Sequence, residues 1–529
     1  HPGWIYQAWF PHSSMAKFFG VADKVPFFYA PSEEVFLMRT FLHPDWMPIA
    51  LVTIVYFLTV IPSDIALSLL TRQLYIEIEK LPFPMSLSTA LSINTLIKRD
   101  KERFNILVLC SLIGFIYGMI LYGLPVIGDL FGIPLRFLPI PWYDFNIFLH
   151  KVIPGASLGI ITDLAAFSTG FIVPFPSIRG MFSSSFAFYF IGNALLVNMG
   201  LTAFSREWAF GMSVTDSYQR SFLYAWICPG LGVALAAGLT PILLKPKVLV
   251  QTFSSLRKLK TGGGNLYWIL GVFLSCTSAL TIFDLILAPD VPVWMLIFLN
   301  MLWPFIYILI IARGEAEAVP FSIPYMRELV FTLGGLKAGS PGWFVPINLT
   351  SSWTMRFKIC EITRTDHMSF IKGMLIAFPI SLLFGWIYMQ RFWQIAPIPS
   401  PRYPATEIYW PLMATFQSIF VSRSQEFFVP QWILGAFAIT AILYIILSRF
   451  NLGLIVIGMA AGVFSAIPGT FSMLISGIIG QILQRIIGRE NWRRKAPLIV
   501  AGLGLGEGLA VGLAGAIAII TSSMWILPY

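Results

Sequence analysis

Charged residues are scarce in this chain: they make up 11% of its 529 residues, whereas 57% are hydrophobic. The mean hydropathy is correspondingly high, at +0.78. This composition excludes an ordinary soluble domain and requires many membrane-spanning segments. Apolar runs such as 47–70 and 267–288 are much longer than a barrel strand needs, so the expected spans are helices. The predicted fold class is all-α, a polytopic transmembrane helix bundle of two related halves with broken or re-entrant helices.

Cysteine and histidine are also rare, with four and five residues, and no Cys-x-x-Cys or His-Glu-x-x-His pattern is present. We therefore expect no metal site and no cofactor. The net charge of +10 comes from short basic clusters between apolar runs rather than from one basic face, so no nucleic-acid partner is expected. The lipid bilayer is the partner that this composition requires.

Twelve spans form the working prediction, and four shorter broken segments are candidates for re-entrant hairpins or further spans. The expected spans lie at about 47–70, 104–123, 152–175, 180–203, 221–244, 265–288, 291–312, 368–389, 431–449, 451–466, 468–484 and 497–524. The broken segments lie at about 82–97, 318–336, 343–355 and 409–421.

Basic residues predict the orientation. The connections 72–103, 245–260, 313–364 and 485–495 are rich in Lys and Arg, and the alternate connections are poorer. By the positive-inside rule the rich set is cytoplasmic, which places residues 1–46 and the C-terminal Tyr529 outside a cytoplasmic (plasma) membrane. The sequon at Asn348-Leu349-Thr350 then lies on the wrong side for glycosylation, so we expect it to be unused.

The chain divides into four expected parts. Residues 1–46 are aromatic-rich and interrupted by prolines, typical of an ordered extracytoplasmic cap. A first transmembrane half at 47–244 and a second at 265–529 are joined by a cytoplasmic linker at 245–264, which ends in three glycines. Because the chain begins at His1 rather than Met, we expect a processed product or a portion of a longer chain, with spans missing upstream.

Two stretches echo each other: Glu79 to Pro84 follows Arg72, and Glu317 to Phe321 follows Arg313. Each comes after a long apolar run and breaks with proline where the apolar sequence resumes. Broken helices in corresponding halves indicate a substrate site near the bilayer midplane, and a helix starting at a proline can direct free N–H groups at an anionic part of a substrate. The expected path residues are Pro82, Phe83, Pro84, Ser86, Ser88, Thr89, Asn94, Pro320 and Phe321.

The alternatives are that the echo is chance in a Phe- and Pro-rich chain and that 82–96 is a solvated interfacial helix. For Arg72 and Arg313 we favour snorkelling to the lipid headgroups over closing the site.

Ionisable groups inside spans are costly and therefore mark candidate functional sites, because a buried carboxyl group can exchange a proton or pair with a cationic substrate group. Glu507, set among glycines at 502, 504, 506 and 508, is the first candidate, and Asp163, expected mid-span, is the second. Glu79 and Glu317 complete the set. Asp64 and Asp284 are interpreted as boundary residues. Each carboxyl group can equally be a structural hydrogen-bond acceptor, and the glycines can equally serve close helix packing.

An enzyme is not expected. Gly155-Ala-Ser157-Leu-Gly159 fits the Gly-x-Ser-x-Gly pattern of serine hydrolases, but no strand precedes it and His150 is the only histidine near it in the sequence.

The proline-led segment from Arg72 to Leu96, the segment Arg313 to Phe321, and Ala501 to Leu509 resemble motifs of the oligopeptide transporter superfamily, which includes the yellow stripe-like metal-chelate carriers. The resemblance is strongest to a divergent prokaryotic-type branch. It implies two related halves around a central path and proton-driven uptake of peptides or metal complexes. It also implies about sixteen spans, more than this chain offers.

The sequence therefore predicts a secondary active transporter, coupled to protons, that moves small peptides or peptide-like or metal-chelate solutes. The alternative is a non-transporting integral membrane scaffold of a cell-envelope complex, held through residues 1–46. A channel is a third reading, disfavoured because no charged ring or filter-like segment is seen. A homo-oligomer or an envelope partner is compatible with either of the first two.

Overall fold

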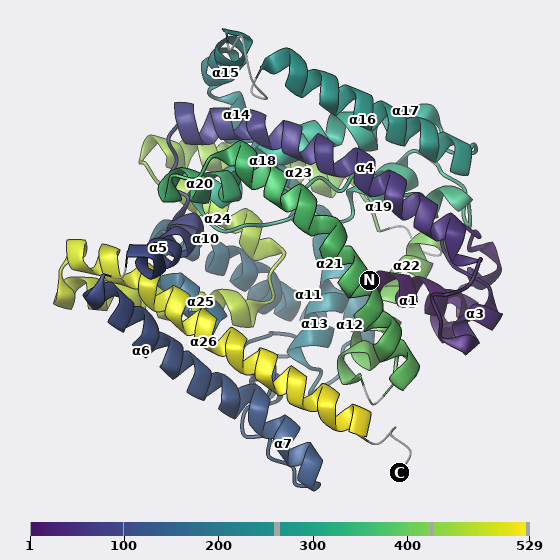
Figure 1. The fold of residues 1–529 in the computed structure, drawn as a ribbon, viewed down its shortest axis with the longest axis horizontal. Helices are drawn as coiled ribbons and strands as arrows, with labels where there is room; N and C mark the ends of the chain where they lie inside the picture. Colours follow the sequence, from purple (N-terminus) through teal and green to yellow (C-terminus); the bar gives the residue numbers. More distant parts are fainter. Residues whose placement is uncertain (1, 99, 259–264, 401–402, 424–426, 525–529) are drawn as a thin grey trace.

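Helices make up nearly all of the regular structure in the computed structural model, which describes residues 2–98, 100–258, 265–400, 403–423 and 427–524. Within those residues ten helices are long and apolar enough to cross a membrane. The protein is thus an all-α, multi-span membrane protein, as predicted (Figure 1). The ten helices are Trp46–Ile78, Lys101–Phe131, Phe175–Met199, Val214–Leu243, Leu266–Leu287, Val293–Glu317, His367–Ile395, Pro430–Arg449, Ile467–Ile487 and Arg489–Ala518.

Five of these helices contain a wider, π-helical stretch, so that the labels in Figure 1 change within one continuous helix. Their parts are α4 (Trp46–Thr71) with η3 (Arg72–Ile78), α6 (Lys101–Gly118), η4 (Met119–Gly123) and α7 (Leu124–Phe131), α10 (Phe175–Ser185), η6 (Phe186–Gly192) and α11 (Asn193–Met199), α13 (Val214–Ser221), η7 (Phe222–Trp226) and α14 (Ile227–Leu243), and α17 (Val293–Ile297), η8 (Phe298–Leu302) and α18 (Trp303–Glu317). The undivided ones are α16 (Leu266–Leu287), α21 (His367–Ile395), α23 (Pro430–Arg449), α25 (Ile467–Ile487) and α26 (Arg489–Met524).

Shorter elements connect and cover these helices. They are α1 (Pro2–Trp9), η1 (Phe10–His12), α2 (Ser14–Phe18), η2 (Ala22–Lys24), α3 (Glu33–Met38), α5 (Pro84–Lys98), α8 (Asn146–Leu149), α9 (Leu164–Ser168), η5 (Thr169–Phe171), α12 (Ala203–Glu207), α15 (Pro246–Lys258), α19 (Met326–Leu333), η9 (Pro341–Phe344), α20 (Thr354–Thr363), α22 (Pro404–Ser422) and α24 (Gly453–Val463). Strands β1 (Trp142–Asp144) and β2 (Gly159–Ile161) pair antiparallel, with Trp142 opposite Ile161.

Two of the twelve expected spans are absent as long helices. The prediction for 152–175 is wrong: this stretch holds β2, the five-residue α9 and irregular backbone, because Pro154, Gly155 and Pro174 interrupt its apolar sequence. The segment expected at 451–466 forms only the 11-residue α24. Of the four broken segments, 82–97 lies largely in α5, 318–336 holds α19, 343–355 has mostly no regular structure, and 409–421 lies in the 19-residue α22.

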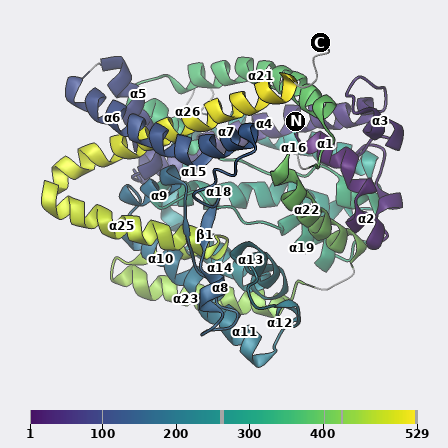
Figure 2. The ribbon, with the colours of Figure 1, turned by 90° about the horizontal axis from the view of Figure 1, so that it is seen from below.

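Helices pack in pairs drawn from distant parts of the chain. The pairs α6 with α26, α10 with α24, α14 with α23, and α4 with α16 make the most extensive contacts. In Figure 1, α4 and α16 lie along one edge, α6 and α26 lie along the opposite edge, and α21 runs obliquely between them. Figure 2 shows α25 and α26 as the two arms of a V. The sharp turn between these arms is at Gly488, whose φ of 91° suits glycine.

The α6–α26 contact explains part of the glycine pattern around Glu507. A Cβ at Gly506 would overlap the carbonyl oxygen of Ser111, whereas a Cβ at Gly508 would meet no atom within 4 Å. We expect Gly506→Ala to lower the free energy of unfolding by about 1–3 kcal/mol through overpacking, and Gly508→Ala to leave it nearly unchanged. Thermal unfolding of both variants in detergent measures this difference, and equal midpoints would contradict the packing assignment.

The N-terminal segment folds as short helices that pack on α22 and near the ends of α4 and α21. Helix α2 contacts α22, and the rings of Trp4, Phe41, Trp46 and Trp393 form an aromatic cluster. In the predicted linker, residues 246–258 form α15, while Gly262, Gly263 and Gly264 lie outside the described residues.

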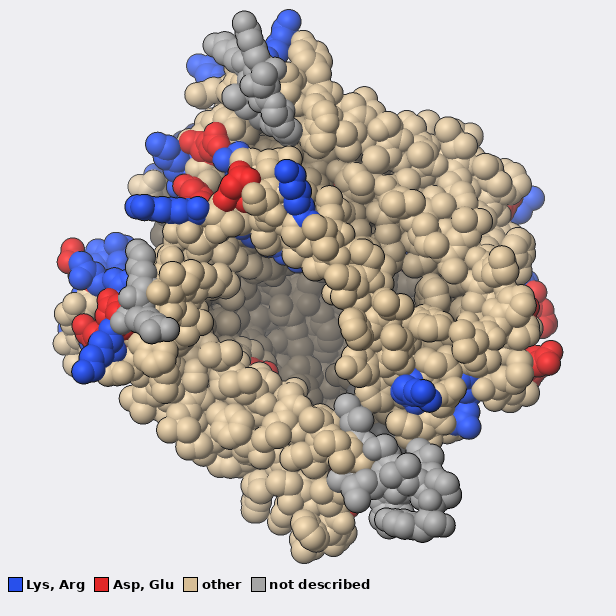
Figure 3. Space-filling view, viewed as in Figure 1, with Lys and Arg blue, Asp and Glu red and all other residues tan. Residues whose placement is uncertain are grey.

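Lysines and arginines crowd at one end of the molecule. Helix α5 packs on α20 and α26, which brings the basic stretches 100–103, 356–364 and 489–495 together. Figure 3 shows most of the Lys and Arg of this face at that end, opposite the end that carries α1 and α3 in Figure 1. The middle of the face is hollowed and almost free of charge.

Candidate functional site

The two echoing stretches meet inside the protein. The helix of η3 ends at Ile78 and α18 ends at Glu317, and each is followed by residues without helical structure before α5 and α19 begin. The backbone N–H of Phe83 donates to the carbonyl oxygen of Ala316 at 2.9 Å. This bond joins the first break directly to the end of the second helix, so the two interruptions are a single structural feature.

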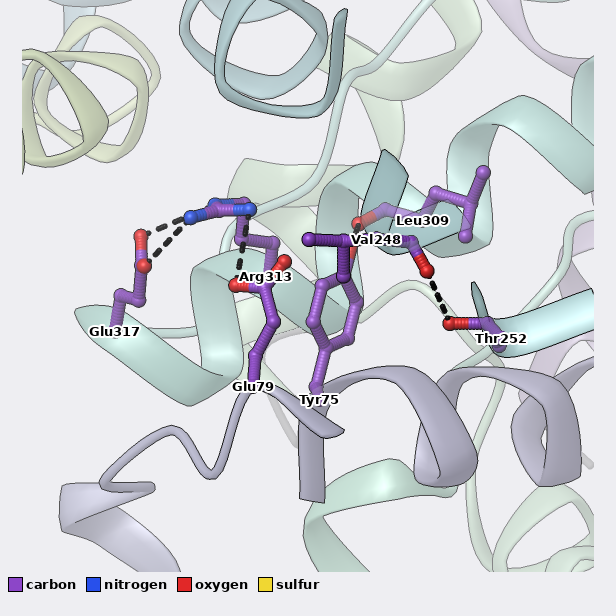
Figure 4. Close-up of polar contacts among 7 residues, drawn as sticks. All are labelled: Tyr75, Glu79, Val248, Thr252, Leu309, Arg313 and Glu317. Atoms are coloured by element: carbon purple, nitrogen blue, oxygen red, sulfur yellow. Dashed lines mark hydrogen bonds and ion pairs between the residues drawn. The ribbon is translucent and has the colours of Figure 1, made fainter. Parts of the chain in front are cut away.

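Arg313 lies at the centre of this meeting point, drawn in Figure 4. Its Nη2 is 2.8 Å from Oε1 of Glu317 on the same helix, and its Nη1 is 3.5 Å from Oε2 of Glu79. The Arg313 side chain is 3% exposed. Snorkelling is therefore wrong for Arg313, because a guanidinium inside the protein is stabilised by carboxylates on both sides.

Arg72, its counterpart in the first stretch, behaves differently. Its Nη2 is 2.6 Å from Oε1 of Glu77, and the two side chains are 26% and 41% exposed. The two arginines also differ in register, since Arg313 lies seven residues before Pro320 and Arg72 lies ten residues before Pro82. Their burial depends on which neighbours cover them.

Tyr75 on η3 lies beside Arg313 and bonds to α18. Its hydroxyl donates to the carbonyl oxygen of Leu309 at 2.8 Å, which ties η3 to α18, and the Arg313 guanidinium lies 6.0 Å from its ring centre. Helix α15 packs beside η3, where Thr252 donates to the carbonyl oxygen of Val248 (Figure 4).

Each break lines a cavity. Pro82 and Pro84 line one of about 640 Å³. Pro320 and Phe321 line another of about 410 Å³, with residues from the end of α24. Phe83 itself is fully buried between its neighbours, with a φ of 46°.

The larger cavity has a second proline-led wall that the sequence analysis missed. Residues 174–176, Pro-Phe-Pro, repeat the sequence of residues 82–84. Pro174 and Phe175 line the same cavity as Pro82 and Pro84, at the starts of α10 and α5. Gln481, Gln484, Arg489 and Arg493 line it as well, and none of the acidic residues that the structure describes does. The repeat was visible in the sequence and was a usable signal.

The polar residues predicted along α5 are used mainly for packing. The Ser86 hydroxyl donates to the carbonyl oxygen of Met355, the Ser88 hydroxyl to that of Pro497, and the Asn94 amide to that of Ile362, at 3.0, 2.7 and 3.5 Å. Thr89 is exposed, and none of these four side chains lines the 640 Å³ cavity.

Glu507 and Asp163 meet at the start of α9. Glu507, 3% exposed, accepts the backbone N–H groups of Leu164 and Ala165 at 3.3 and 2.7 Å. Asp163 accepts the N–H of Ala166 at 2.6 Å, so it is the N-cap of α9 rather than a mid-span residue as predicted. Glu507 thereby holds α26 to the start of α9, ahead of the residues that line the 640 Å³ cavity.

Within the described residues no histidine contacts Ser157, the serine of the Gly-x-Ser-x-Gly pattern. Ser157 is fully buried and faces Asn146, whose amide nitrogen is 3.5 Å from its hydroxyl. His150 instead contacts the carbonyl oxygen of Ala156 through Nε2 and accepts the N–H of Gly211 through Nδ1. Burial lowers the pKa of His150, consistent with a neutral ring in this setting.

The sequon is inaccessible. Asn348 is 1% exposed, and its side chain hydrogen-bonds within the protein, so the folded chain cannot carry a glycan there.

The chain matches no protein-family model and none of the curated proteins.

Proposed function

We propose that this multi-span helical membrane protein is a secondary active transporter, coupled to protons, for small peptides or peptide-like or metal-chelate solutes. We also propose that the chain is related to the oligopeptide transporter superfamily, which its sequence resembles. The observation that carries it is the meeting of two interrupted helices at the buried Arg313, with a cavity beside each interruption. Interrupted helices at membrane depth are characteristic of transporters, where the freed backbone groups line a solute site.

The composition of the larger cavity suits an anionic part of a solute, such as a peptide carboxylate. Arg489 and Arg493 supply positive charge, two helices begin at its edge, and Gln481 and Gln484 add hydrogen-bonding groups. In the proposed orientation this cavity lies toward the cytoplasmic side, because it is lined by the basic start of α26.

In the proposed cycle Glu507 exchanges the coupling proton. Its carboxylate holds the start of α9, and a proton on it would weaken both bonds to Leu164 and Ala165. Because the residues after α9 line the larger cavity, this exchange offers a route from protonation to the shape of the solute site.

The proposal is tested with purified protein in liposomes. Uptake of a mixed di- to hexapeptide pool, with and without ferric chelates, is measured under an imposed proton gradient. Accumulation that depends on the gradient would support a coupled carrier and identify its solute class. No accumulation by correctly inserted protein would contradict the proposal and favour the scaffold.

The scaffold remains the second candidate because of the cap. Phe18 and Phe27 are 79% and 72% exposed on residues 1–46, and exposed aromatic residues outside a membrane can bind a partner. A stable envelope partner that is lost on deletion of the cap, together with absent transport, would establish that alternative.

Replacing both cavity arginines tests the solute chemistry. We expect Arg489→Gln with Arg493→Gln to raise the KM for peptides with a free carboxyl end by about tenfold, the effect of losing roughly 1.4 kcal/mol, and to change the KM for amidated peptides much less. Arg485→Gln is the matched control, since Arg485 is exposed and does not line the cavity. Equal effects on both peptide classes would contradict an anion site.

A further inference from the structure

A stretch of non-helical backbone runs through the interior beside α4, and hydrogen bonds join several of its residues to neighbouring helices. Residues 345–353, between η9 and α20, have no helical structure, and Asn348, Thr350 and Thr354 are buried. The N–H of Trp353 donates to the hydroxyl of Ser68, and the hydroxyls of Thr354 and Thr71 are 2.6 Å apart. Non-helical backbone at membrane depth must be covered by protein, and here polar side chains of neighbouring helices bond to it.

Two buried carboxyl groups on different helices are connected to this stretch, Asp64 directly and Asp284 through Asn300. Asp64 on α4, 4% exposed, accepts both the N–H and the hydroxyl of Ser351 through Oδ2, at 3.1 and 3.0 Å. Asp284 on α16, fully buried, accepts the amide of Asn300 through Oδ2 at 2.8 Å. Asn300 in turn accepts the backbone N–H of Asn348 at 2.9 Å.

The other oxygen of each carboxyl group has no partner. Oδ1 of Asp64 and Oδ1 of Asp284 are buried and unbonded in the described part of the chain. Neither group forms an ion pair there, in contrast to Glu79 and Glu317 beside Arg313. A buried carboxylate held only by neutral donors keeps an uncompensated charge, and a proton on the free oxygen removes that charge.

Bound metal is a poorer occupant. Within the described residues no group of three or more His, Cys, Asp or Glu side chains is arranged to hold a metal ion. A proton requires only one oxygen, and each carboxyl group offers one.

The stretch also contacts α18 close to Arg313. The Ser352 hydroxyl donates to Oε2 of Glu315 on α18 at 2.8 Å, and Glu315 lies two residues after Arg313. Asn348 reaches α4 as well, since its amide is 3.4 Å from the hydroxyl of Ser63. The non-helical residues 348–352 therefore connect both carboxyl groups, Asp284 through Asn300, to the end of α18, where the two broken helices meet.

We propose that Asp64 and Asp284 are proton-binding groups and that residues 348–352 transmit their protonation state to α18. The role in coupling rests on the proposed transport function, whereas the binding of protons does not. Tyr56 faces Asp64 on the same helix, α4, and Tyr307 on α18 and Arg356 on α20 face Glu315. In the described part of the chain no titratable group faces Asp284, whose partner Asn300 is a neutral amide.

Infrared difference spectroscopy on a pH change, in H2O and D2O, tests the proposal directly. We expect the carbonyl band of protonated, buried carboxyl groups to lose one component in Asp64→Asn and another in Asp284→Asn. Ser351→Ala is expected to shift the Asp64 component without removing it, since it deletes one of the two donors to Oδ2. Glu102→Gln is the matched control, because Glu102 is 75% exposed and pairs with Lys495.

The outcomes separate the two proposals. If the assigned components are present and the liposomes show no uptake, proton binding is supported and the transport function is contradicted. If uptake is driven by the gradient but neither Asn variant changes the carboxyl band, the inference is overturned and the transport function is unaffected. Unchanged bands in both variants overturn the inference whatever the uptake result.

Discussion

Uptake driven by a proton gradient is expected to fall to background in Glu507→Gln, with insertion and folding unchanged. The Gln side chain keeps one oxygen that can accept the N–H of Ala165, the shorter of the two bonds that Glu507 receives. It cannot exchange a proton, and its amide nitrogen cannot accept the second N–H, from Leu164. Loss of transport with retained structure would place the coupling function on the carboxyl group itself.

Initial uptake rates and thermal unfolding are measured on the same preparations, with Glu102→Gln as a control for removing an acidic residue at an exposed position. Unchanged uptake in Glu507→Gln would remove Glu507 from the coupling machinery and leave it as a cap of α9. A loss of uptake accompanied by unfolding would be judged with Asp163→Asn, which alters the same helix start through its own cap.

A large loss of stability is expected in Arg313→Met, about 3–5 kcal/mol, because removing the cation leaves Glu79 and Glu317 inside the protein without their partner. Arg72→Met should cost less than about 1 kcal/mol, since its ion pair with Glu77 is largely open to solvent or headgroups. In the echoing stretches Arg313 lies four residues before Glu317 and Arg72 lies seven residues before Glu79, so the comparison is between two ion-paired arginines that differ in burial.

Thermal unfolding in detergent, or unfolding by a denaturing detergent, measures both changes. Combining Arg313→Met with Glu79→Gln and Glu317→Gln should recover most of the lost stability, because the uncompensated charges are then removed. Equal stabilities for the two arginine variants would contradict a cluster that depends on burial, and failure of the combined variant to recover would assign the loss to packing.

The sequence predicted the long helices well because an uninterrupted apolar run of span length has few alternatives in a membrane. The run at 152–175 is the instructive failure. Its hydropathy is high enough, but Pro154, Gly155 and Pro174 interrupt it, and it forms strand β2, which pairs with β1 outside the run, and the short helix α9, which Asp163 caps. Counting apolar residues cannot distinguish a span from irregular backbone covered by other helices.

The candidate site was predicted in outline and not in detail. Corresponding interruptions suggested that 79–84 and 317–321 belong together, and they are joined at Phe83 and Ala316. The pairing of Arg313 with Glu79 and the bond of Asp64 to Ser351 join residues far apart in the sequence, 287 positions in the second case. The link from Asp284 through Asn300 to Asn348 is shorter, but it too depends on the fold. Such contacts leave no local pattern.

The bond between Phe83 and Ala316 involves only main-chain atoms, and this limits how the protein can vary. Side-chain substitutions can reshape the cavities beside Pro82 and Pro320 while that bond persists, because it does not depend on which side chains are present. A displacement of one interruption relative to the other would break this bond. If the cavities bind a solute as proposed, its fit can therefore be altered by substitutions that leave the junction in place.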